Sequence, residues 1–185
     1  MPHASLISWR SEETLWERGY THVAGIDEAG RGALAGPVVA AAVICRPGVT
    51  IAHVDDSKRL SPAERDELSH MIRQVALGIG IGFVEASVID RVNIRQATLL
   101  AMQAAVQDLA CQPDFLLVDG RDRVPVNQPQ QIVVRGDQTV GSIAAASIVA
   151  HRVCKSPRSK AGTSSQRPGK RRLFSVPSAA GCWRT

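Results

Sequence analysis

Short-spaced cysteine and histidine motifs are absent from this 185-residue sequence. Its four cysteines, Cys45, Cys111, Cys154 and Cys182, form no Cys-x-x-Cys pair, and its histidines form no His-Glu-x-x-His motif. Zinc sites commonly use such spacings, and four scattered cysteines do not suggest a disulfide framework. We therefore expect reduced thiols and no zinc site.

Long apolar runs are also missing. No stretch reaches the roughly 18 to 20 apolar residues that a membrane-spanning helix needs. The first 20 residues contain Glu12, Glu13 and Glu17, whereas a secretory signal peptide would be apolar there. The sequence therefore predicts a cytoplasmic protein with no membrane partner, and we expect a monomer.

Acidic residues are absent from the last 35 positions. Residues 151–185 hold nine Lys and Arg and no acid, whereas residues 1–150 hold thirteen basic and seventeen acidic residues, so the net charge of +5 comes from the tail. The tail is rich in Ser, Pro and Gly and shows no helical or strand periodicity, which is typical of disorder. We expect one domain over residues 1–150 and a basic tail that is disordered or foreign to that domain.

The hydrophobic pattern of residues 1–150 alternates strands with helices. Helices are predicted over residues 12–19, 61–77, 93–110 and 139–150, and strands over 22–27, 36–45, 77–86, 113–120 and 131–137. The helix start at Ser61 combines a cap, a proline at the first helical position and a capping box with Glu64. The first two strands are close enough to form a hairpin or meander. This order predicts an α/β domain.

Four acids fall at predicted strand ends or strand-to-helix turns: Asp27, Glu28, Asp119 and Asp137. Functional groups collect at such ends in α/β sheets. Carboxylates that lie together repel one another unless cations neutralise them, and hard oxygen ligands select Mg²⁺ or Mn²⁺. Two such ions can activate water and stabilise the leaving oxygen in phosphodiester cleavage. The positions of these acids therefore suggest a divalent-metal site.

Each acid also has a purely structural interpretation. Asp137 could cap the helix that follows it, and Asp119 could end its strand in a turn with Gly120. Glu28 could form an ion pair with Arg31. The spacing alone leaves these alternatives open.

A glycine-rich turn, with Gly30, Gly32 and Gly36, follows the first two acids. Such a turn lets a nucleic-acid backbone approach closely. The rival interpretation is a dinucleotide-binding loop, but such a loop opens a helix, and here a strand is predicted to follow. Two acids would also lie where the pyrophosphate has to bind. We therefore favour the nucleic-acid interpretation.

The segment GIDEAGRGALAGPVVAAAVI resembles the opening motif of ribonuclease HII, and DDSKRLS, NIRQATLLAM, FLLVDG, RGD and SIAAASIVA follow in the family's order. The likeness covers about residues 12–150. It implies a ribonuclease H-like fold, in which helices flank a mixed central sheet. It also implies an endonuclease that cleaves the RNA strand of RNA–DNA hybrids or nicks at ribonucleotides embedded in duplex DNA, with Mn²⁺ or Mg²⁺ as two ions per site.

The resemblance also implies roles for individual residues. The family's four metal-binding acids map onto Asp27, Glu28, Asp119 and Asp137. Its Gly-Arg-Gly element, whose backbone would contact the ribose 2′-hydroxyl, maps onto Gly30, Arg31 and Gly32. Its phosphate-contacting pair maps onto Ser57 and Lys58. The structural alternatives are a salt bridge from Arg31 to one of the acids and an ordinary solvated lysine at Lys58.

The resemblance ends at Ala150. The family continues with a KVTRD-like helix end, where this chain has Lys155 in the aspartate's register, and then an HKGYGT-like segment whose tyrosine stacks at the RNA–DNA junction. The single tyrosine here is Tyr20, far upstream. From about His151 the sequence is either a shifted reading frame or a divergent basic end. The C-terminal part of the fold is thus missing or replaced, and the alternative function is a non-catalytic or weakly active binder of hybrids.

Overall fold

The computed structural model describes residues 7–32, 36–49, 51 and 61–155. The elements follow one another as α1 (Arg10–Glu17), β1 (Val23–Ala29), β2 (Val38–Ile44), α2 (Pro62–Val75), β3 (Gly78–Val84), α3 (Ala86–Val92), α4 (Ile94–Asp108), β4 (Phe115–Asp119), β5 (Gln130–Val133), the 3₁₀ helix η1 (Gly136–Gln138) and α5 (Gly141–Cys154).

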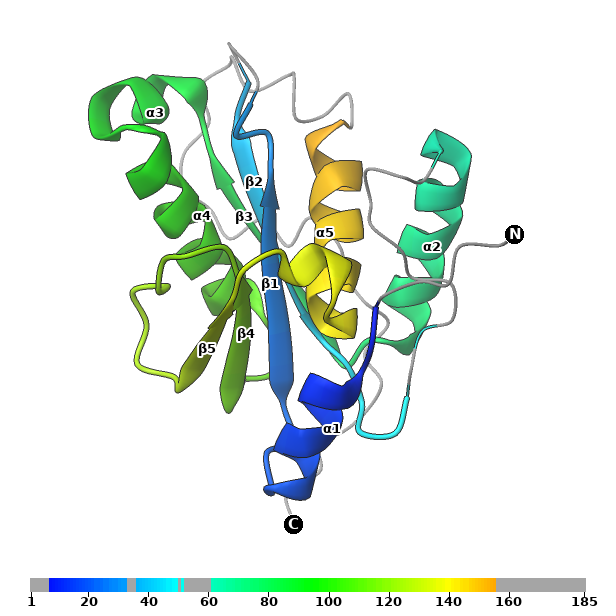
Figure 1. Cartoon of the computed structure of the whole chain (residues 1–185). Helices are drawn as coiled ribbons and strands as arrows, with labels where there is room; N and C mark the ends of the chain where they lie inside the picture. The colour runs from blue at the N-terminus through cyan, green and yellow to red at the C-terminus, as the bar shows by residue number, and fades with distance from the viewer. Residues whose placement is uncertain (1–6, 33–35, 50, 52–60, 156–185) are drawn as a thin grey trace.

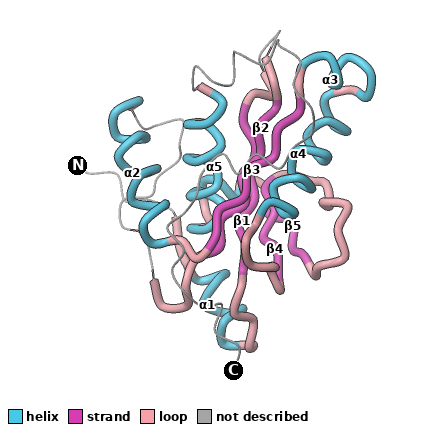
Figure 2. The backbone as a smooth tube through the Cα atoms, turned by 180° about the vertical axis from the view of Figure 1, so that it is seen from behind, coloured by secondary structure: helices cyan, strands magenta, loops and turns pink. Residues whose placement is uncertain are grey.

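Five strands form one mixed sheet in the order β3-β2-β1-β4-β5. β1 and β3 each pair with β2 in antiparallel orientation, whereas β4 runs parallel to both β1 and β5. Helix α4 covers one face of the sheet, α5 covers the other, and α2 packs outside α5 (Figures 1 and 2). The expected α/β fold, with helices flanking a mixed sheet, is confirmed, and so is the hairpin of the first two strands.

Alternation along β1 divides its side chains between the two faces. Ala24 and Ile26 belong to the apolar cluster under α4, and Val23 belongs to a cluster on the α5 side. Because side chains alternate with a period of two along a strand, Asp27 projects toward α5 and Glu28 toward α4. The acids are therefore presented from both faces of one central strand.

A glycine allows α5 to lie directly on β1. A Cβ atom added at Gly25 would overlap the backbone of Ser142, at the start of α5. Any larger residue at this position would push the helix away from the strand. Gly25 is two residues before Asp27, so this close contact sets the spacing of the two elements beside the acids.

Two of the predicted helix starts, at Ser61 and Asn93, are confirmed, whereas α1 begins two residues earlier and α5 two residues later than expected. Ser61 accepts from the backbone N–H of Glu64, and the Glu64 carboxylate accepts from the backbone N–H of Ser61, which completes the capping box. The side chain of Asn93 accepts from the backbone N–H of Gln96 at the start of α4. Short-range sequence signals were sufficient for both helices.

Several boundaries differ from the sequence-based expectations. β1 continues through Ala29, so the first two acids lie inside the strand. β5 ends at Val133 because Arg135 adopts a left-handed conformation, and Asp137 therefore lies on η1 rather than at a strand end. Helix α3 was not predicted; it is short and has no side-chain cap.

The expected domain boundary at residue 150 falls within α5, which continues to Cys154. The division into a domain and a tail stays a prediction, because residues 156–185 lie outside the described part of the chain. Within the described part, every helix is too short or too polar to cross a bilayer.

Candidate functional site

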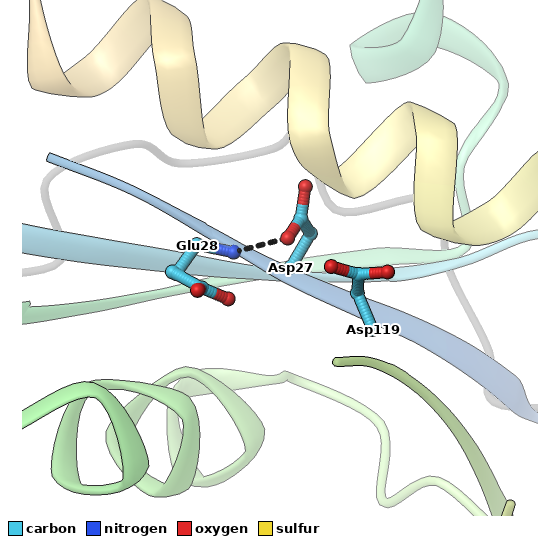
Figure 3. A group of neighbouring side chains, drawn as sticks. All are labelled: Asp27, Glu28 and Asp119. Atoms are coloured by element: carbon cyan, nitrogen blue, oxygen red, sulfur yellow. Dashed lines mark hydrogen bonds between the residues drawn. The ribbon is translucent and has the colours of Figure 1, made fainter. Parts of the chain in front are cut away.

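Two neighbouring parallel strands bring three carboxylates together. Ile26 of β1 pairs with Val118 of β4, and the next step along both strands reaches Asp27 and Asp119. Glu28 follows Asp27 directly. One oxygen of each of these three carboxylates lies within 4.8 Å of the others. Figure 3 shows the three side chains around β1, with Asp27 on the side of α5 and Glu28 on the opposite side, toward α4.

Asp27 is the most enclosed of the three, with a relative exposure of 5%. Burial raises its pKa well above the ordinary value of 3.8, and the charges of Glu28 and Asp119 raise it further. Two hydrogen bonds oppose this shift: the backbone N–H of Glu28 donates to Asp27 Oδ1 at 2.7 Å, and the Ser147 hydroxyl of α5 donates to the carboxylate. The protein thus holds a carboxylate where its charge is poorly solvated.

Glu28 has a similar environment with one nearby cation. Burial raises its pKa, and so does the charge of Asp119, whereas Arg31 lowers it. Arg31 Nη1 lies 3.4 Å from Glu28 Oε1, and the arginine side chain is 51% exposed. The ion-pair interpretation of Arg31 is therefore confirmed. This exposed arginine also remains accessible to an anionic ligand.

Asp119 is held by the segment after β5. The backbone N–H of Gly136 donates to its Oδ1 at 2.6 Å. Burial raises the Asp119 pKa and the charge of Asp137 raises it further, while backbone hydrogen bonds from Gly136, Asp137 and Gly120 lower it. The third carboxylate is therefore fixed in orientation, although its charge is destabilised.

Asp137 lies beside this group without belonging to its compact core. It is 4% exposed on η1, and it is close enough for its charge to act on Asp119. Among the described residues, the group within 4.8 Å contains only the other three predicted acids. The charge of Asp137 therefore affects the site through its interaction with Asp119.

The donor set fits a divalent cation. The three carboxylates supply the hard oxygen ligands that Mg²⁺ and Mn²⁺ prefer. Burial is the main cause of their raised pKa values, and the repulsion between the carboxylates raises them further. A bound cation would remove that repulsion. Asp27, Glu28 and Asp119 are the residues that would hold it, with Asp137 adjacent.

The glycine turn is partly described. Gly30 has a φ of +94°, and a Cβ there would overlap the carbonyl oxygen of Pro37, so the position requires glycine. A Cβ at Gly32 would meet no atom of the described residues within 4 Å. Ser57 and Lys58, the predicted phosphate contacts, lie outside the described residues.

Ser147 is a site residue that the sequence analysis missed. It is 1% exposed on α5 and its hydroxyl contacts Asp27. The signal available in the sequence was a serine within an apolar small-residue helix. Such a serine more often hydrogen-bonds to its own helix, so the pattern alone did not identify it.

Comparison with known proteins places these residues in a family. The profile described as Ribonuclease HII matches residues 24–159. A relative named Ribonuclease HII from Geobacter sulfurreducens is 56% identical over 142 residues, which cover 77% of this chain and 65% of the relative. The chain thus spans slightly less than two thirds of that relative's length.

Solved structures show the same fold. The chain described as ribonuclease H2 from Pyrococcus horikoshii OT3 matches with a TM-score of 0.64 at 24% identity, over 71% of each chain. The chain described as Bst-RNase HIII in complex with Mn²⁺ matches with a TM-score of 0.58 at 22% identity, over 73% of this chain and 52% of that one. These likenesses confirm the ribonuclease H-like architecture. Because the family profile covers most of the sequence and the relative is 56% identical, the chain belongs to the ribonuclease HII family.

Proposed function

We propose that this chain carries the active site of an endoribonuclease. Its substrates would be the RNA strand of RNA–DNA hybrids and ribonucleotides embedded in duplex DNA, and its reaction would be metal-assisted hydrolysis of a phosphodiester. The observation that carries the proposal is that one oxygen each of Asp27, Glu28 and Asp119 lies within 4.8 Å of the others, where β4 ends beside β1. Family membership supports the same chemistry.

The proposed metal ligands are Asp27, Glu28, Asp119 and Asp137. Divalent ions, when bound, supply charge stabilisation and a water of lowered pKa. Asp27 and Asp119 are proposed to contribute most to the shared metal position, because their strands are direct neighbours. Glu28 is assigned to the side of the leaving group and Asp137 to the side of the attacking water.

The glycine turn is the proposed contact for the ribose. Gly30, Arg31 and Gly32 follow Glu28 after one intervening residue, Ala29, and a Cβ at Gly32 would meet no described atom within 4 Å, which lets a sugar–phosphate backbone approach. Backbone groups of this turn would contact the 2′-hydroxyl, the group that distinguishes RNA from DNA at a given position. Ser57 and Lys58 are proposed to contact a phosphate.

The identity of the ion and the cellular setting belong to the proposal as well. We propose Mn²⁺ or Mg²⁺, with two ions bound in the presence of substrate; the description of one solved neighbour includes Mn²⁺. We also propose that residues 1–150 form the catalytic domain, that the protein acts as a monomer, and that it is cytoplasmic.

A nicking assay tests the proposal. The purified chain is incubated with a DNA duplex containing one ribonucleotide, with an RNA–DNA hybrid, or with an all-DNA duplex as the matched control. We expect cleavage of the first two substrates with Mn²⁺ or Mg²⁺ and none with EDTA. A salt-dependent mobility shift without any cleavage would contradict the proposal and favour a non-catalytic binder.

A further inference from the structure

The N-terminal segment before β1 is clamped to the start of α5. Ser8 pairs with Val140 as an isolated parallel bridge, in which Ser8 N donates to Thr139 O at 3.0 Å and Gly141 N donates to Ser8 O at 3.1 Å. The Trp9 ring fills the space where a side chain at Gly141 would lie. These contacts connect residues about 130 positions apart in the sequence.

Glu12 completes this clamp from inside the protein. Its side chain is fully buried, and its Oε1 accepts from the backbone N–H of Ser142 at 2.6 Å. Val140, the residue that precedes α5, supplies no side-chain cap. Glu12 on α1 therefore provides the hydrogen-bond acceptor that a backbone N–H at a helix N-terminus needs.

The residue held by Glu12 is the one that touches β1. The backbone of Ser142 lies against Gly25, and two residues further along β1 comes Asp27. Five residues further along α5 comes Ser147, whose hydroxyl contacts Asp27. These steps are about 7 Å along a strand and about 7.5 Å along a helix. The contact of Ser142 with Gly25 and that of Ser147 with Asp27 therefore follow one another along α5 and β1.

We propose that Glu12 is a positioning residue of the carboxylate site: by holding Ser142 at Gly25, it sets where α5 presents Ser147 to Asp27. The inference rests on the proposed metal site for its consequence, and it goes beyond it because Glu12 lies before the region matched by the family profile, which starts at residue 24. Glu12 does not touch the reacting groups.

Two variants of nearly equal shape distinguish the loss of the hydrogen-bond acceptor for Ser142 N from a loss of side-chain volume at position 12. Glu12→Gln keeps a carbonyl oxygen for Ser142 N, whereas Glu12→Met fills the same space and accepts no hydrogen bond. Mn²⁺ affinity is measured by calorimetry without substrate, at a temperature where each variant is folded by circular dichroism. We expect Glu12→Gln to stay within about twofold of the wild type and Glu12→Met to bind about three- to tenfold more weakly, as for loss of an outer-shell contact. Equal affinity of the two variants would overturn the proposal.

A double-mutant cycle tests whether Glu12 acts through Ser147. Ser147→Ala alone should weaken Mn²⁺ binding about tenfold. If Glu12 acts through that hydroxyl, the double variant Glu12→Met/Ser147→Ala should bind no more weakly than Ser147→Ala. If instead the affinity losses of the two single variants multiply in the double variant, the proposal is overturned. Such a result would show that Glu12 affects Mn²⁺ binding without Ser147.

Matched controls exclude a general loss of stability. Glu13→Met removes the neighbouring carboxylate of α1, which is exposed. Ser69→Ala removes a buried hydroxyl of α2 that makes no hydrogen bond to the described residues. Both should keep wild-type Mn²⁺ affinity. Should Glu12→Met not fold, Glu12→Asp replaces it: the carboxylate is one methylene shorter and withdraws from Ser142 N, and unchanged affinity would overturn the proposal.

Hydrogen exchange provides a readout that does not need the metal. In Glu12→Met, amides of residues 142–147 and 25–28 should exchange faster, while those of α4 keep their protection. Unchanged exchange at residues 142–147 would overturn the inference about Glu12. If the wild type itself binds no Mn²⁺ and nicks no substrate, the proposed function fails, and the exchange experiment still decides how Glu12 acts on α5.

Discussion

The backbone N–H of Gly136 donates to Oδ1 of Asp119 at 2.6 Å, and this bond joins the end of β4 to the turn that carries Asp137. The left-handed Arg135 makes that turn possible. The hydrogen bond between the end of β4 and η1 therefore helps to assemble the site. A change in this turn would move two of the four proposed ligands together.

Neutralising one central carboxylate should separate activity from stability. Asp27→Asn and Asp119→Asn should each abolish nicking, because an amide is a poor ligand for a hard cation in place of a carboxylate. Without metal, Asp27→Asn should raise the free energy of unfolding at neutral pH, because burial and the charges of Glu28 and Asp119 oppose the charged form of Asp27. Nicking and urea unfolding measure the two effects. Asp90→Asn, at an exposed position of α3, is the control; retained Mn²⁺-dependent activity in Asp27→Asn would contradict the assignment.

The cost of burying the Asp27 charge should also appear in the pH dependence of the free energy of unfolding. Asp27 has a raised pKa in the folded chain, so above its ordinary value of 3.8 the folded state keeps a proton that the unfolded state has lost. The free energy of unfolding contributed by this group therefore falls as pH rises through the folded-state pKa. The stabilisation by Asp27→Asn should thus grow as the pH rises above about 4. Urea unfolding in EDTA measures it, and a constant difference from the wild type would contradict it.

Divalent ions should stabilise the wild type through this group. A ligand that binds the folded state alone adds about 2.7 kcal/mol at a concentration one hundred times its dissociation constant. We expect Mn²⁺ to raise the melting temperature of the wild type and to leave that of Asp27→Asn nearly unchanged. Thermal unfolding with and without EDTA provides the comparison. An equal Mn²⁺ shift in both proteins would place the bound ion elsewhere.

The two glycines of the turn should respond differently to alanine. Gly30→Ala places a Cβ against the Pro37 carbonyl at a positive φ, and should cost about 1 to 3 kcal/mol of stability. Gly32→Ala meets no atom within 4 Å in the part of the chain that the structure describes and should change stability by less than about 0.5 kcal/mol. If a nucleic-acid backbone approaches Gly32, the Gly32→Ala variant should have a higher KM than the wild type and the same melting temperature. A Gly32→Ala protein with wild-type KM would exclude that contact.

Helix caps, which depend on residues close together in the sequence, were predictable. Side-chain contacts between residues far apart in the sequence were not. The capping box at Ser61 and the cap at Asn93 depend on atoms three residues apart, so the sequence was sufficient to locate them. Ser147 and Glu12 act on partners more than 100 residues away, and neither residue type indicates such a partner by itself. The strand predicted to end at Asp137 was wrong because a single left-handed residue turned the chain earlier.

The sequence by itself determined helices α1, α2, α4 and α5, the succession of the strands along the chain and the family whose motifs contain the acids. Periodicity, capping and ordered motifs are properties of neighbouring residues. Only the tertiary structure decided that Asp27 and Asp119 lie side by side, that Arg31 pairs with Glu28, and that α5 is held close to β1 at Gly25. Strand register and helix-on-sheet distance depend on packing across the whole domain, and that packing is what turns separate carboxylates into one site.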